Sequence, residues 1–171
     1  CHESIYDGTL SSIRYDNNLE LIDSVSSFGK SSCYLELTLD RTHIININYW
    51  DSSITIHPLK NNIISSTPPK LYNPITPNKI VHKDDHLKDR QSTSHHHSCV
   101  FYQDSLYVPD LGKDRIDIYK FINNGLIYNG YMMLPAGSGP RYGVIKKNLM
   151  YIVNEISSTV AVILLDNMKI L

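Results

Sequence analysis

The chain has 171 residues, of which 42% are hydrophobic and 19% charged, a composition typical of a folded globular protein rather than a disordered one. Its formal net charge of −1 provides no electrostatic attraction to nucleic acid or to an anionic membrane, so we expect neither as a partner. No stretch reaches the ~18 consecutive apolar residues that a membrane-spanning helix requires.

The amino-acid usage favours an all-β fold. The chain contains 21 Ile, 19 Ser, 14 Asn and 12 Tyr, but only two Ala. β-Branched and aromatic residues fit pleated strands, Asn and Ser suit turns, and helices draw on alanine, which is nearly absent.

The cysteines and the chain ends carry two further expectations. Cys1, Cys33 and Cys99 are an odd number without the short spacings of a zinc site, which favours a reducing compartment such as the cytoplasm. Because the sequence starts at Cys1 and stops at Leu171 inside a strand-like run, we expect a piece of a longer protein or an incomplete gene model.

Short alternating runs predict half-buried strands along the chain. Leu35, Leu37 and Leu39 alternate with polar residues, so this run is predicted to be a strand with one apolar face, and RIDIYKF at 115–121 is similar. Long segments with a period of 3.6 residues are missing from the sequence, so no helix of more than about two turns is expected.

These runs recur as a larger unit of two strands joined by a tight turn. The copies are IININYWDSSITIHPL at 44–59, LYVPDLGKDRIDIYKF at 106–121 and MYIVNEISSTVAVILL at 150–165, with a truncated copy around His2-Glu3. The equivalent polar pairs Asn48-Tyr49, Pro109-Asp110 and Asn154-Glu155 are 61 and 45 residues apart. A period of roughly 40–50 residues with about four short strands per unit is typical of the blades of a β-propeller.

The longer spacing contains a long loop, predicted at 60–98 within a propeller that occupies 1–171. Its first part is rich in Pro, Asn and Ser, and its last part ends on a histidine triplet. A loop of this length in a compact domain is usually functional or disordered.

Three features have residue types suited to the chemistry of an anionic ester. His95 and His97 are alternate residues of an extended segment and are expected to point to the same side. Arg141 follows a Gly-Ser-Gly-Pro turn, and its guanidinium is suited to carboxylate or phosphate oxygens. Glu155 follows a predicted strand, and a glutamate or a histidine can take a proton from water.

The register of the repeat connects these residues. Asn48, Asp110 and Glu155 belong to the equivalent polar pairs of consecutive units, so we expect them at one mouth of a central channel. Propellers commonly bind ligands there, because loops from several blades meet at that mouth.

A metal site is not expected. His82, His86, His95 and His97 could supply ligands together with Asp84 or Asp85, but their spacing matches no HExxH or Cys-His pattern. We therefore predict neither a metal nor another cofactor.

Six segments in order resemble the lactonase family of seven-bladed β-propellers, which contains bacterial-type 6-phosphogluconolactonases and fungal carboxy-cis,cis-muconate cyclases. They are SSFGKSSCYLEL (26–37), NYWDSSITIHPL (48–59), RQSTSHHHSC (90–99), VPDLGKDRIDIYKF (108–121), GSGPRYGV (137–144) and YIVNEISSTVAV (151–162). The resemblance covers nearly the whole chain and implies about three to four of the seven blades.

The resemblance implies a set of site residues. The family's His-Pro-His pair falls on His95 and His97, its Gly-Pro-Arg arginine on Arg141 and its Asn-Glu glutamate on Glu155. The proline between the two histidines is replaced here by His96, and the histidine that follows the arginine is replaced by Tyr142, which cannot act as a base near neutral pH.

The function implied is hydrolysis of a small anionic sugar lactone, with 6-phosphogluconolactone of the pentose phosphate pathway as the first choice. In this hypothesis His97, Arg141 and Glu155 are catalytic, whereas His95, Asp110 and Asn48 bind or orient the substrate. One alternative is an enzyme that lactonises carboxy-cis,cis-muconate. Another is a non-catalytic propeller that binds protein partners, because a fold does not fix a function.

Overall fold

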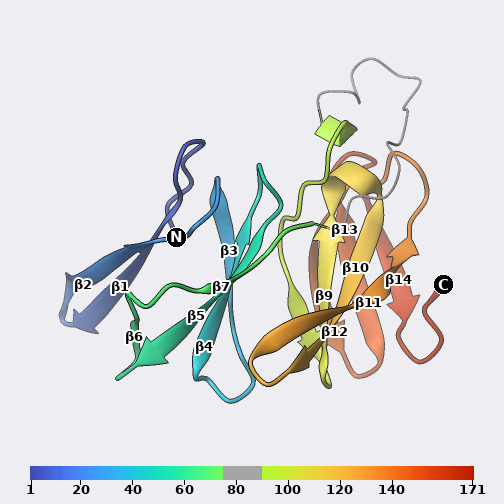
Figure 1. Ribbon diagram of the computed structural model, residues 1–171. Helices are drawn as coiled ribbons and strands as arrows, with labels where there is room; N and C mark the ends of the chain where they lie inside the picture. Colours follow the sequence, from blue (N-terminus) through green and yellow to red (C-terminus); the bar gives the residue numbers. More distant parts are fainter. Residues whose placement is uncertain (75–89) are drawn as a thin grey trace. The chain divides into compact units, whose positions relative to one another are not determined.

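The computed structural model describes residues 1–74 and 90–171, which are built almost entirely from β-strands (Figure 1). These residues divide into two compact units, with the division at Pro74. Within the described ranges the strands are accompanied by the 3₁₀ helix Leu111–Lys113 and by the helical residues Arg90 and Gln91, and no helix there is long and apolar enough to span a bilayer. The predicted all-β class is confirmed.

The first unit consists of a hairpin and a larger sheet. Strands β1 and β2 pair only with each other, β3 to β6 follow one another in chain order, and β7 adds to β5; all these pairs are antiparallel. The strands are β1 (Thr9–Asp16), β2 (Asn18–Ser26), β3 (Ser32–Leu37), β4 (His43–Asn48), β5 (Ile54–Lys60), β6 (Ile63–Ile64) and β7 (Lys70–Tyr72).

The second unit consists of two four-stranded antiparallel sheets, each with its strands in chain order. The first sheet contains β8 (Val100–Tyr102), β9 (Ser105–Asp110), β10 (Arg115–Ile122) and β11 (Gly125–Met133), with the 3₁₀ helix η1 (Leu111–Lys113) between β9 and β10. The second contains β12 (Pro140–Lys146), β13 (Leu149–Asn154), β14 (Thr159–Leu164) and β15 (Lys169–Ile170).

The predicted repeat is confirmed, because each copy is the middle hairpin of one sheet. The copies correspond to the hairpins β4–β5, β9–β10 and β13–β14. The truncated copy also fits, since His2 bridges to Thr9 at the start of β1 much as Asn154 pairs with Thr159 in the last sheet.

Asparagines make the tightest turns between the strands. Asn61 and Asn62 between β5 and β6, and Asn123 and Asn124 between β10 and β11, all have positive φ angles of 51–64°. Two consecutive residues with positive φ are the mark of a type I′ hairpin turn, and asparagine tolerates this conformation better than most residues.

One predicted strand is shorter than expected. The run of alternating leucines ends as a strand at Leu37, and Leu39 lies in the following turn with 67% of its surface exposed. The turn begins early because the Thr38 hydroxyl donates to Asp40 and the Thr38 carbonyl accepts from the backbone N–H of Arg41. The single apolar face predicted for this run is therefore wrong.

The segment predicted as one long loop, 60–98, is partly strand. It contains β6 and β7, both of which pair with β5. Residues 75–89, with His82, Asp84, Asp85 and His86, lie outside the described residues.

The two sheets of the second unit share an apolar core. Side chains from β9 and β10 pack against side chains from β13 and β14 in one cluster. This packing fixes the two sheets, and the loops at their ends, relative to each other. The buried members of this core are Tyr107, Ile116, Leu134, Met150, Ile152, Ile163 and Leu165.

Candidate functional site

Glu155 lies directly after β13 and is held against the glycine turn that precedes β12. Its backbone N–H donates to the carbonyl of Gly139 at 2.8 Å, and the N–H of Ser157 donates to the carbonyl of Ser138 at 3.2 Å. These two bonds place the glutamate beside the segment that carries Arg141.

The turn at 137–139 requires glycine for conformational reasons. Gly137 and Gly139 have φ angles of +77° and +60°, and a Cβ at Gly139 would lie 2.6 Å from the side chain of Ile156. The buried carboxylate of Asp114 accepts the backbone N–H groups of both glycines at 2.7 Å. Asp114 therefore fixes the direction in which β12 begins.

The structure brings two of the predicted site residues, Arg141 and Glu155, together and adds a second arginine. Arg141 Nη1 donates to Oε2 of Glu155, while Arg90 Nη2 donates to Oε1. Both arginine side chains are nearly half exposed, whereas the glutamate is 26% exposed. We call these three residues the Arg90–Glu155–Arg141 cluster.

The cluster has two positive charges for one negative charge. Burial alone would raise the pKa of Glu155, but the hydrogen bonds and charges of Arg90 and Arg141 outweigh it, so this pKa is lowered. Glu155 is therefore ionised at neutral pH, and in this arrangement it is a weak proton acceptor.

Residues 94–98, which we call the histidine segment, run beside the start of β12. The Ser98 hydroxyl donates to the carbonyl of Arg141 at 2.8 Å. His96 is fully buried and its Nε2 lies 2.9 Å from Asp117, so on an extended backbone His95 and His97 project to the opposite side. His97 is partly exposed, whereas His95 is buried with Nε2 3.2 Å from the Thr93 hydroxyl.

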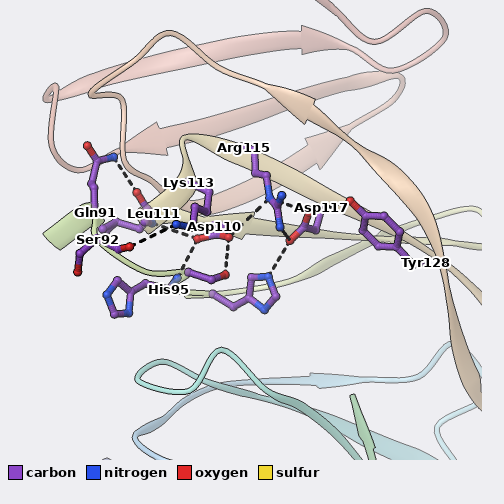
Figure 2. A network of polar contacts seen from close by, with 12 residues as sticks. Gln91, Ser92, His95, Asp110, Leu111, Lys113, Arg115, Asp117 and Tyr128 are labelled. Carbon is purple, nitrogen blue, oxygen red and sulfur yellow. Dashed lines mark hydrogen bonds and ion pairs between the residues drawn. The ribbon is translucent and has the colours of Figure 1, made fainter. Parts of the chain in front are cut away.

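Asp110 organises the backbone of the histidine segment. Its carboxylate is completely buried and accepts from the backbone N–H of His95 at 2.8 Å, the Ser94 hydroxyl at 2.5 Å and the N–H of Gly112 at 3.1 Å (Figure 2). The last bond caps η1. The predicted direct contact of Asp110 with substrate stays a prediction.

Beside Asp110 lies a buried charge network that extends into the sheet (Figure 2). The guanidinium of Arg115 is 2.9 Å from Asp117 through Nε, donates to Asp117 through Nη2 at 3.0 Å, and is 3.7 Å from Asp110. His96 completes the network through Asp117. All four side chains are at most 2% exposed.

This network includes a donor set that resembles a metal site. His96, Asp110 and Asp117 present ligand atoms within 4.8 Å of one another. The permanently charged guanidinium of Arg115 already contacts both carboxylates, so a cation there would face a fixed positive charge at close range. The donor set therefore fits the arginine rather than a metal ion.

Asn48 belongs to the first unit, where it stabilises the turn after β4. Its amide donates to the Ser53 hydroxyl at 2.9 Å and its carbonyl accepts from Asn46 at 3.0 Å. It is fully buried. Its part in binding substrate stays a prediction.

Sequence reasoning missed Arg90 and Asp114 as members of the site. Arg90 opens the RQ segment on which the family resemblance partly depends, but its 65-residue separation from Glu155 gives no signal of contact. Gln91, the residue after Arg90, connects Arg90 to Asp114, because the side-chain amide of Gln91 donates to Asp114 at 2.7 Å. A buried acid that accepts two glycine N–H groups is visible only once the turn is folded.

Comparison with known proteins agrees with the sheets described above. The family model "Lactonase, 7-bladed beta-propeller" matches residues 1–170. A 6-phosphogluconolactonase of Bacillus subtilis is 26% identical over 147 residues, which are 84% of this chain and 38% of that protein. An uncharacterised protein of Staphylococcus aureus is 28% identical over 165 residues, covering 90% of this chain and 45% of that protein.

Solved structures share the fold at lower identity. The periplasmic gluconolactonase PpgL of Pseudomonas aeruginosa superposes with a TM-score of 0.77 at 22% identity, covering 96% of this chain and 48% of that chain. A crystal structure from Bacteroides fragilis gives a TM-score of 0.79 at 23% identity, covering 98% and 50%.

The chain therefore belongs to the lactonase family of seven-bladed β-propellers. It spans less than half the length of the curated relatives it matches. Its three multistranded sheets and one hairpin correspond to the predicted three to four blades.

Proposed function

We propose that the protein hydrolyses a sugar lactone, with 6-phosphogluconolactone as the favoured substrate and the cytoplasm as its location. The observation that carries this proposal is the Arg90–Glu155–Arg141 cluster, which lies exposed next to the histidine segment. Guanidinium groups are suited to phosphate and to the oxyanion that develops when a lactone carbonyl is attacked. The family membership and the Bacillus subtilis relative support the same chemistry.

In this proposal Arg141 holds the anionic group of the substrate or stabilises the developing oxyanion. Either Glu155 or His97 accepts a proton from the attacking water. In the arrangement described here His97 is favoured, because both oxygens of Glu155 are occupied by arginines and the pKa of Glu155 is lowered. Asp110 supports the histidines by holding the backbone of His95.

The test is enzyme-dependent turnover of 6-phosphogluconolactone by the intact protein, corrected for spontaneous hydrolysis. Arg141→Ala is expected to lower turnover by about 10²–10³, the usual effect of losing one oxyanion-stabilising donor. Arg14→Ala is the matched control, because Arg14 is an exposed arginine whose partner is Glu20 on the neighbouring strand.

Two results would count against the proposal. Near-normal turnover in Arg141→Ala would remove this arginine from the mechanism. A folded intact protein without turnover would favour a different lactone, a muconate-lactonising reaction or a binding scaffold. Assaying carboxy-cis,cis-muconate in parallel separates the second of these from the others.

A further inference from the structure

The Arg90–Glu155–Arg141 cluster contains two cationic side chains and one anionic side chain, and it is accessible from solvent. Each guanidinium binds a different oxygen of one carboxylate, so Glu155 bridges the two arginines as an oxyanion ligand would. One carboxylate is thus shared between two guanidinium groups.

We propose that Arg90 and Arg141 form one anion-binding site in which Glu155 is a built-in counter-ion, displaced when a phosphate, sulfate or similar oxyanion group of a ligand enters. That this ligand is the lactone substrate rests on the function proposed above, but the anion site itself does not. Arg90 becomes a binding residue that neither the sequence motifs nor the family comparison assigned.

The geometry allows this exchange without moving the backbone. Glu155 is anchored through its N–H to Gly139, and Arg141 lies at the start of a strand that is paired with β13. Only the flexible side chain of Glu155 has to swing away, and its partial exposure leaves solvent on one side. A dianionic oxyanion offers more charge and more acceptor oxygens to the two guanidiniums than one carboxylate does.

The exchange has a chemical consequence for Glu155. Its described charged neighbours are Arg90 on one side and Arg141 on the other, and both lower its pKa. An entering anion would take these partners away, so the two arginines would no longer lower the pKa of the carboxyl. Ligand binding would thus convert Glu155 from a weak proton acceptor into a stronger one.

Sulfate binding to the intact protein at pH 7 tests the proposal, because sulfate keeps its charge over the accessible pH range and needs no turnover. Isothermal titration is carried out on the wild-type protein and on Glu155→Gln, Arg90→Gln and Arg90→Lys. Glu155→Gln removes the competitor, so sulfate should bind about tenfold more tightly. Arg90→Gln should bind it about tenfold more weakly, and Arg90→Lys should recover part of the loss because it keeps the charge.

Arg14→Gln is the matched control and should leave sulfate affinity unchanged. A Glu155 that merely orients the arginines predicts the opposite sign, with weaker binding in Glu155→Gln, and that result would overturn the proposal. Unchanged affinity in Arg90→Gln would overturn it as well, provided that thermal melting shows the variant to be folded. The expected sulfate pattern in a protein without lactonase turnover would retain the anion site while the proposed function fails.

Discussion

Arg115 is a permanently charged side chain in the interior of the second unit, with 1% of its surface exposed. Removing a guanidinium from water is costly, and it is tolerated only where the compensating charges and hydrogen bonds have good geometry. Here Asp117 supplies two contacts, Asp110 contributes at longer range, and the ring of Tyr131 lies 5.2 Å from the guanidinium carbon. The network joins β9 and β10 to the histidine segment, so it holds that segment in place.

Asp117→Asn is therefore expected to destabilise the protein strongly. The substitution leaves the buried guanidinium without its main counter-charge, and breaking a buried pair in this way costs about 3–5 kcal/mol. Urea unfolding of the intact protein measures the change. Asp104→Asn is the control, because Asp104 pairs with Lys120 on the surface and its loss should be far milder. Equal effects of the two substitutions would show that the buried network contributes little.

At the scale of single residues, the sequence predicted what depends on local pattern. Arg141 lies near the start of β12 and Glu155 directly follows β13, and residue type and the family motifs named both as site residues. Arg90 could not be predicted, because its contact with Glu155 depends on how the chain returns from a long insertion. The complete burial of His96 follows from its pairing with Asp117, which no spacing rule indicates.

At the scale of elements, strands and hairpins were predictable because alternation and turn residues are local signals. The repeat identified three middle hairpins, and paired asparagines mark two of the tight turns. The predicted strand of alternating leucines is too long at its end. The Thr38 hydroxyl donates to the side chain of Asp40 in a turn, and the strand ends at Leu37, before Leu39. A local hydrogen bond there outweighs the hydrophobic pattern.

The sheet formed by β3, β4 and β5 contains a polar ladder in place of a purely apolar face. Thr55 accepts from Asn46 at 3.0 Å and donates to the carbonyl of Ser27 at 3.0 Å, while Nε2 of His57 lies 3.1 Å from the Thr55 hydroxyl. His57 is 1% exposed. Burial, only partly offset by a hydrogen bond to the Ser27 backbone, lowers the pKa of His57 to about 4.

This lowered pKa predicts that acid weakens the fold. The unfolded chain binds a proton at His57 near pH 6.5, whereas the folded chain does so only near pH 4. The contribution of His57 to the unfolding free energy should therefore be constant above pH 6.5. It should fall as the pH drops toward 4, by about 3 kcal/mol in total. Urea titrations at several pH values give this slope.

The comparison between two histidine variants isolates the effect of His57. His57→Gln should flatten the slope between pH 6.5 and 4, whereas His43→Gln, a partly exposed histidine on β4, should preserve it. An unchanged slope in His57→Gln would assign the acid sensitivity to other groups.

At the scale of the whole molecule, the described residues expose apolar surface on the β1–β2 hairpin and on the last sheet. The β1–β2 hairpin pairs with no further strand among the described residues. Its apolar side chains are 58–76% exposed at Ile13, Tyr15, Leu19 and Leu21. Val160 and its paired neighbour Val153 on the last sheet are 60% and 46% exposed. The curated relatives are more than twice as long, and their family has seven blades.

We therefore expect residues 1–171, produced alone, to self-associate, because exposed apolar sheet faces and open strand edges favour contact with other chains. Size-exclusion chromatography with light scattering should show oligomers or aggregates whose proportion rises with concentration. Val153→Lys combined with Val160→Lys places two charges on the exposed face and should shift the distribution toward monomer, whereas Lys146→Arg retains the charge of its exposed site and should not. A wild-type monomer with a sharp cooperative melt would show that these sheets are stable without the blades that their relatives possess.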